Sequence, residues 1–101
     1  MNQLPKSQRF NVGKVKWTLV HFKSISGLAR VLEFGAKKYS KDNWKIGLDK
    51  EEILDSLTRH LAALIDGETF DEESLLPHID HIMANAMFYS YFQNKNKEEQ
   101  K

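Results

Sequence analysis

The chain has 101 residues, of which 41% are hydrophobic, and this suffices for one folded domain with a modest core. Its 15 Lys and Arg residues against 14 Asp and Glu leave no basic excess, so we do not expect a DNA or RNA polymer as partner. The chain has no cysteine, no apolar run long enough to span a membrane and no signal core, which excludes disulfides and predicts a cytoplasmic protein of the bacterial host cell.

The first predicted elements are an extended arm and a helix. Residues 1–23 read as the arm, because their charges are scattered and no helical pattern appears. Residues 15–20 (VKWTLV) favour β-structure but have no partner strand. A helix follows from Ser24, and Gly35 within it is expected to permit close backbone packing. The expected apolar stripe of this helix consists of Ile25, Leu28, Ala29, Leu32 and Ala36, widened by Val31 and Phe34.

A second helix is expected after a structured loop over residues 38–48 (KYSKDNWKIGL). Asp49 is its expected N-cap, and Gly67 is expected to stop it just after Asp66. The side chains expected to point inward are Ile53, Leu57, Leu61 and Leu64.

The third expected helix follows an acidic connection, residues 68–74. Asp71 or Ser74 could cap this helix, Pro77 fits only its first turn, and the helical pattern carries Ile79 through Phe92. The charged segment 95–101 is expected to be a flexible tail.

These elements predict an all-α fold, a small bundle of three main helices over residues 24–94 that follows the extended arm. Three amphipathic helices of this size leave much apolar surface uncovered. We therefore expect a homo-oligomer, in which dimerisation completes the bundle. The apolar side chains that would serve the core or the dimer surface are Met83, Met87, Phe88, Tyr89 and Phe92.

One face of the third helix is polar. His78, His81 and Asn85 are spaced by three and four residues, so their side chains share that face. Imidazoles bind divalent metals when neutral and phosphate when protonated, and an amide can read a base edge or orient a ligand. His60, on the apolar side of the second helix, can join them in a compact bundle. The alternative is that these residues are half-buried side chains with ordinary hydrogen-bond partners.

Other polar and aromatic residues allow two readings each. Lys37 and Lys38 can meet phosphate, but Lys37 also lies four residues from Glu33, as in an ordinary surface pair. Arg59 stands in the same relation to Asp55. The third case is the aromatic side chain of the 38–48 loop, Trp44, which either stacks on a nucleobase or covers an edge of the core.

Several separate blocks together resemble a known family. They are LEFGAKKYSKDNW (32–44), LTRHLAALIDGE (57–68), DEES (71–74) and HIDHIMANAMF (78–88). In this order and spacing the blocks are similar to the dATP/dGTP diphosphohydrolases of phages and bacteria, which are related in name and fold to the MazG-like all-α nucleotide pyrophosphohydrolases. The resemblance extends over about residues 13–92.

The resemblance implies a metal-dependent nucleotide site, with one departure in the ligands. MazG-like enzymes hold Mg²⁺ through acidic E-x-x-E and E-x-x-D motifs on two helices. This chain keeps Glu33, but Ala36 stands three residues on, and His78 and His81 stand where the second motif would lie. Because Mg²⁺ prefers oxygen ligands, the imidazoles indicate Mn²⁺, another transition metal, or no metal.

The activity implied by the resemblance is cleavage of a purine (d)NTP to the monophosphate and pyrophosphate with Mg²⁺ or Mn²⁺. The expected metal ligands are Glu33, His60, His78 and His81. Glu33, His60 and Asn85 are the expected catalytic residues, and the expected substrate-binding residues are Lys37, Lys38, Asn43, Trp44 and Arg59. The alternative is a non-catalytic module that sequesters a nucleotide, for example in phage counter-defence, on the same scaffold.

Overall fold

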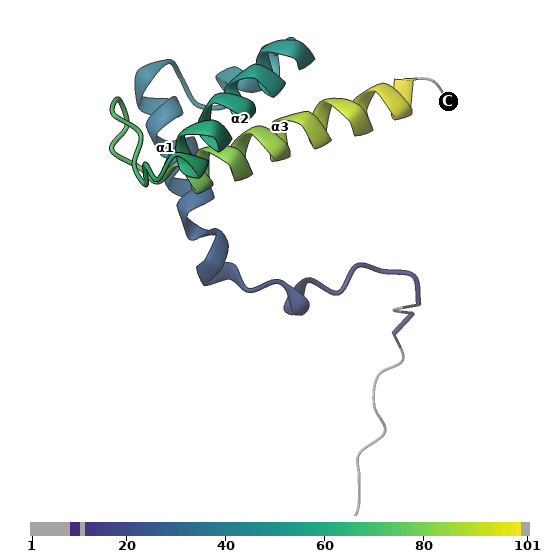
Figure 1. Cartoon of the computed structure of the whole chain (residues 1–101). Coiled ribbons are helices and arrows are strands. Elements are labelled where there is room, and N and C mark those ends of the chain that lie inside the picture. The colour runs from purple at the N-terminus through teal and green to yellow at the C-terminus, as the bar shows by residue number, and fades with distance from the viewer. Residues whose placement is uncertain (1–8, 11, 100–101) are drawn as a thin grey trace, which may run out of the picture.

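The computed structural model describes residues 9, 10 and 12–99 (Figure 1). Three α-helices form the bundle: α1 (Ser26–Lys38), α2 (Lys50–Ile65) and α3 (His78–Glu99). Three short 3-10 helices accompany them: η1 (Trp17–Leu19), η2 (Phe22–Ile25) and η3 (Asn43–Ile46). The expected all-α class is confirmed.

The long helix α3 organises the bundle. It packs mainly against α2 and to a smaller extent against α1 (Figure 1). The described residues before α1 run away from the bundle, and residues 15–20 contain η1 instead of the β-structure that their sequence favours. Among the described residues, the only β-type pairing is an isolated bridge between Phe70 and Pro77, because residues 15–20 find no partner strand.

The ends of α2 follow their local sequence signals. The Asp49 carboxylate accepts a hydrogen bond from the backbone N–H of Glu51 at 3.3 Å. Gly67 adopts φ +93°, and its N–H donates to the Leu64 carbonyl at 3.0 Å. Both predicted ends of α2 are therefore confirmed.

Both ends of α3 differ from the prediction. Neither Asp71 nor Ser74 caps it; the Pro77 carbonyl accepts from Asp80 N at 3.0 Å, and His78 N donates to the Thr69 carbonyl at 2.8 Å. The helix also continues past Phe92 to Glu99. The sequence QNKNKEE after Phe92 is rich in helix formers and has no Gly or Pro, so nothing stops the helix there. Residues 95–99, expected to belong to a flexible tail, are therefore helical.

The buried interior is small and partly polar. Within the described residues, the buried hydrophobic side chains are Val31, Ile53 and Ala84, and His78 and Asn85 are buried with them. Several residues expected to point inward are exposed, among them Ala29 and Leu61, the latter at 41%. The polar face of α3 thus packs inward, while Ile79, on its apolar side, is 47% exposed.

Close packing of α1 on α3 occurs at Gly27 and not at Gly35. A Cβ at Gly27 would collide with the Asp80 carboxylate, whereas a Cβ at Gly35 would meet nothing within 4 Å. The expected role of Gly35 is therefore wrong, because α1 approaches α3 at its N-terminal turn. None of the helices in the described part of the chain combines the length and apolar character that a membrane crossing requires.

Candidate functional site

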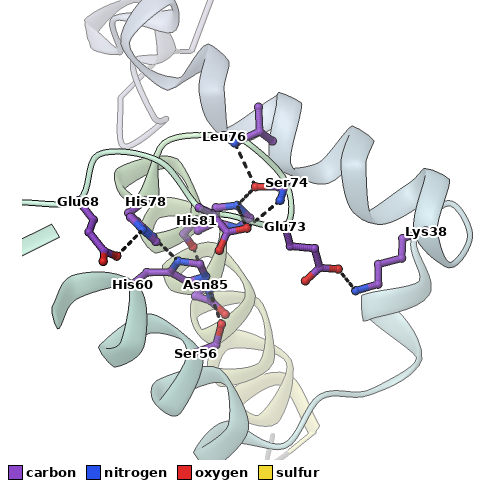
Figure 2. A network of polar contacts seen from close by, with 11 residues as sticks. Lys38, Ser56, His60, Glu68, Glu73, Ser74, Leu76, His78, His81 and Asn85 are labelled. Carbon is purple, nitrogen blue, oxygen red and sulfur yellow. Dashed lines mark hydrogen bonds and ion pairs between the residues drawn. The ribbon is translucent and has the colours of Figure 1, made fainter. Parts of the chain in front are cut away.

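Three histidines from two helices meet where the C-terminal half of α2 packs on the first turns of α3. His60 is on α2, and His78 and His81 lie one turn apart on α3. The Nδ1 atoms of His60 and His78 are 2.8 Å apart, so one ring donates its N–H to the other. The rings of His60 and His81 are stacked, with centroids 4.4 Å apart and planes at 6° (Figure 2 shows the residues). The helical spacing of the sequence thus becomes a cluster of three imidazoles, referred to below as the histidine cluster.

The loop between α2 and α3 holds a carboxylate against this cluster. Asp71 accepts a hydrogen bond from the Ser74 backbone N–H at 2.8 Å, which fixes its side chain in a local turn. Its Oδ2 lies 4.0 Å from His81 Nε2. His60, Asp71 and His78 each offer one atom that could bind a metal, and these three atoms lie within 4.8 Å of one another.

Ser74 fixes the orientation of His81. Its Oγ lies 2.7 Å from His81 Nε2 and accepts a hydrogen bond from Leu76 N at 3.1 Å (Figure 2). Because that nitrogen is engaged with Ser74, Nδ1 is the atom of His81 that remains for another partner.

The ring of His78 is the most buried of the three. His78 is 6% exposed, and its Nε2 is a buried atom without a hydrogen-bond partner in the described part of the chain. Glu68 Oε2 stands 3.8 Å from that nitrogen, at the edge of the cluster (Figure 2). Buried nitrogens are ordinarily paired, so this atom is either a source of strain or a ligand position.

Burial lowers the pKa of two histidines in the cluster. It is the main cause that brings the pKa of His60 and of His81 below 6.5, and the charges of neighbouring imidazoles act in the same direction. Burial acts to raise the pKa of Asp71, but the N–H and hydroxyl of Ser74 and the two histidines outweigh it and lower that pKa. At neutral pH His60 and His81 are therefore neutral imidazoles beside the ionised carboxylate of Asp71.

These residues open into a cleft of about 820 Å³ between α1, α2, α3 and the η3 loop. His60, Asp71 and His81 line one part of it, with Lys38, whose ammonium group donates to Glu73. The bond to Glu73 is the first cause that raises the pKa of Lys38, so its ammonium stays charged. Trp44 and Phe88 line another part, with ring centroids 4.8 Å apart. The cleft is large enough for a small-molecule ligand. Histidines and Lys38 line one part of it, and the aromatic pair, with Lys41 and Lys45 nearby, lines another.

The donor set of the cluster suits a divalent transition metal. Two imidazoles and one carboxylate are ligands of Mn²⁺, Fe²⁺ or Zn²⁺, whereas Mg²⁺ favours oxygen alone. The unpartnered buried nitrogen of His78 is consistent with such a ligand position. The residues present therefore fit a divalent cation.

Comparison with known proteins identifies the family of this chain. The sequence model of the family described as dATP/dGTP diphosphohydrolase, N-terminal, matches residues 5–101. The chain belongs to this family. A curated relative, the dATP/dGTP diphosphohydrolase of Salmonella phage PMBT28, is 34% identical over 86 residues, which cover 85% of this chain and 29% of the relative. The chain thus spans less than a third of that relative's length, and no solved structure matches it.

In this family member, most of the residues predicted for the site lie around the one cleft. The predicted residues that line it are Glu33, Lys38, Asn43, Trp44, His60, His81 and Asn85. His78 is connected to the cleft through its contact with His60, which lines it. Lys37 is exposed and lines a smaller neighbouring cleft of about 310 Å³, to which Glu33 also contributes. Arg59 is exposed and lines neither cleft.

The carboxylate of the cluster differs from the predicted one. Glu33 was the carboxylate among the four expected metal ligands, but the acid grouped with His60 and His78 is Asp71, and His81 is not part of that group. Sequence reasoning assigned Asp71 to a helix cap and also missed Ser74, Glu68 and Ser56. The signal available was Asp71 and Ser74 at a spacing of three, typical of a carboxylate-stabilised turn, in a loop just before the two histidines.

Proposed function

We propose that this cleft binds a purine deoxynucleoside triphosphate and that the chain takes part in its cleavage to the monophosphate and pyrophosphate. The observation that carries the proposal is one cleft with a cationic side chain and the histidine cluster at one end and an aromatic pair at the other. The name of the phage relative, dATP/dGTP diphosphohydrolase, supports the same substrate class.

His60, Asp71 and His78 would hold the divalent metal, and Mn²⁺ suits these ligands better than Mg²⁺. When bound, such a metal supplies Lewis-acid polarisation of a phosphoryl oxygen and activation of water. Glu68, whose Oε2 lies 3.8 Å from His78 Nε2, would add negative charge beside that ligand position.

The remaining residues bind and move protons. Lys38 would neutralise phosphate charge, in competition with its present partner Glu73. His81 is held by Ser74 at Nε2, so it would accept a proton from water at Nδ1 as a general base. Its lowered pKa keeps the ring neutral at neutral pH, as this role requires. Trp44 would stack on the base at the opposite end.

The test is product analysis. The protein is incubated with dATP, dGTP, dCTP and dTTP in Mn²⁺ or Mg²⁺, and the products are separated by chromatography. The expected result is dAMP or dGMP with pyrophosphate, which Asp71→Asn abolishes and Glu72→Gln, an exposed acid of the same loop, does not. Tight nucleotide binding without any product would contradict cleavage and indicate sequestration instead, and neither binding nor product would contradict the nucleotide site.

A further inference from the structure

The orientation of the Asn85 amide is fixed by its partners. Its Nδ2 donates to the His81 carbonyl at 2.9 Å and to Ser56 Oγ at 3.2 Å (Figure 2). A backbone carbonyl can only accept, so the amide nitrogen must face it and the two amide atoms cannot be exchanged. The side chain is therefore locked between α2 and α3 with both of its N–H groups in use.

This arrangement leaves the carbonyl oxygen of Asn85 for the cleft. Asn85 is 8% exposed and lines the cleft. Its Oδ1 makes no hydrogen bond within the described residues, and it is not among the fully enclosed atoms that lack a partner. The Asn85 side chain, more than nine-tenths buried, thus directs its unpaired carbonyl oxygen into the cleft.

Ser56 adds a donor beside this acceptor. Its hydroxyl oxygen accepts from Asn85, which leaves its own O–H to donate. The Thr58 hydroxyl on the same helix donates to the Leu54 carbonyl at 2.7 Å, but Ser56 makes no such bond in the described structure. Ser56 also lines the cleft, so the acceptor and the donor lie side by side.

The aromatic end of the cleft is adjacent to this pair. Phe88 follows Asn85 by three residues on α3, so the two side chains share a face. Trp44 lies against Phe88, with centroids 4.8 Å apart at 34°. A flat ring resting on these aromatics would present its edge to Asn85 and Ser56.

We propose that Asn85 and Ser56 read the hydrogen-bonding edge of the nucleobase, with Asn85 Oδ1 accepting from a base N–H group. Adenine offers its 6-amino group as the donor, and guanine offers its N1–H and 2-amino group. On each base an acceptor lies next to these donors, and the Ser56 hydroxyl can donate to it. This inference rests on the proposed function and assigns Asn85 to base recognition in place of the catalytic role that its sequence position suggested.

A phosphate does not suit the position next to Asn85 Oδ1, because an amide oxygen repels phosphate oxygens. The cations of the cleft are Lys38 beside the histidines and Lys41 and Lys45 near Trp44. A sugar hydroxyl is a donor and remains the competing ligand group, so the test separates base from sugar.

The test compares three ligands whose α,β-oxygen is replaced by methylene, so that they bind without cleavage. They are the triphosphates of deoxyadenosine, of purine 2′-deoxyriboside, which lacks every base N–H, and of 2′,3′-dideoxyadenosine, which lacks the sugar hydroxyl. Affinities are measured by calorimetry in Mn²⁺. Loss of the base N–H is expected to weaken binding about tenfold or more, while loss of the sugar hydroxyl is not.

The variant Asn85→Leu should bind the deoxyadenosine and purine ligands equally. Equal affinity of the wild-type protein for these two ligands, or an unchanged ratio in a folded Asn85→Leu, would overturn base reading and leave the proposed function standing. A loss seen only with the dideoxy ligand would overturn it in favour of sugar recognition. The ligand comparison needs only wild-type protein, so it decides even if the variant fails to fold. No binding of any ligand would overturn both proposals.

Discussion

At the scale of single residues, the stack of His60 on His81 defines the acid–base character of the cleft. The two rings lie 4.4 Å apart, and one of them also contacts the buried His78. Neutral rings stack in this way at little electrostatic cost, whereas charged ones would repel. The stack is therefore favoured while His60 and His81 stay neutral.

This arrangement predicts a loss of stability in mild acid. The pKa values of His60 and His81 lie below 6.5 in the folded chain, so the unfolded chain binds protons more readily. The stabilisation is complete above about pH 6.5 and is lost progressively as the pH falls below that value. Melting temperatures measured from about pH 8 to about pH 5 should therefore decrease.

The double variant His60→Gln with His81→Gln should melt with much less dependence on pH over that interval. His21, an exposed histidine near η2, gives the matched control, since His21→Gln should leave the wild-type profile unchanged. A double variant as acid-sensitive as the wild-type protein would contradict this account of the cluster.

Gly27 and Gly35 give a second prediction at the residue scale. Gly27→Ala places a Cβ against the Asp80 carboxylate, the far end of a side chain that must turn aside, so this variant should be less stable than Gly35→Ala by about 1 kcal/mol. Gly35→Ala, in the same helix but with open space around the Cβ, should stabilise it by up to about 1 kcal/mol. Urea denaturation of both variants measures the difference.

Asp80→Ala added to Gly27→Ala should recover most of the lost stability, because the colliding carboxylate is gone. If both glycine variants change stability alike, α1 does not approach α3 at Gly27 as described.

At the scale of elements, the connection between α2 and α3 decides where the site forms. Local signals predicted the ends of α2 correctly, because a cap at Asp49 and a left-handed Gly67 depend only on neighbouring residues. Asp71 was assigned wrongly because its role depends on α3 folding back beside it. Periodicity likewise predicts that His78, His81 and Asn85 share a face, but not that this face packs on α2, where His60 and Ser56 provide its partners.

The η3 loop closes the aromatic end of the cleft through Trp44. This side chain packs on Phe88, Tyr91 and Phe92 of α3, with centroids at 4.8, 5.0 and 6.3 Å. Trp44→Leu removes these contacts, so it should cost about 1–2 kcal/mol of stability and weaken dATP binding as well. Chemical denaturation and calorimetry measure the two effects separately, and an unchanged affinity for dATP would show that Trp44 only packs on the core.

At the scale of the whole molecule, the chain is less compact than a typical folded domain of its length. Its radius of gyration is 18.4 Å, against about 13 Å for a compact domain of about 100 residues. The long α3 and the described residues before α1 account for this shape (Figure 1). Leu54, Leu61 and Ile65 form an apolar stripe along α2, and each is more than two-fifths exposed.

A small core with such a stripe predicts self-association. Light scattering at micromolar concentration should give at least twice the mass of one chain, and Ile65→Glu should shift that mass toward the monomer. Asp66→Glu, an exposed neighbour, is the control and should have no effect. A wild-type protein with the mass of a single chain would contradict this expectation.

The most direct test of the central claim is the binding of Mn²⁺, followed by electron paramagnetic resonance of the free ion. If His60, Asp71 and His78 form the metal site, the wild-type protein should remove about one Mn²⁺ per chain from solution. Asp71→Asn should weaken that binding at least about tenfold, since a ligand is lost, while Glu72→Gln should bind as the wild-type protein does. Equal binding by Asp71→Asn and wild-type protein, or no binding by either, would contradict the assignment of this cluster as the metal centre of a nucleotide site.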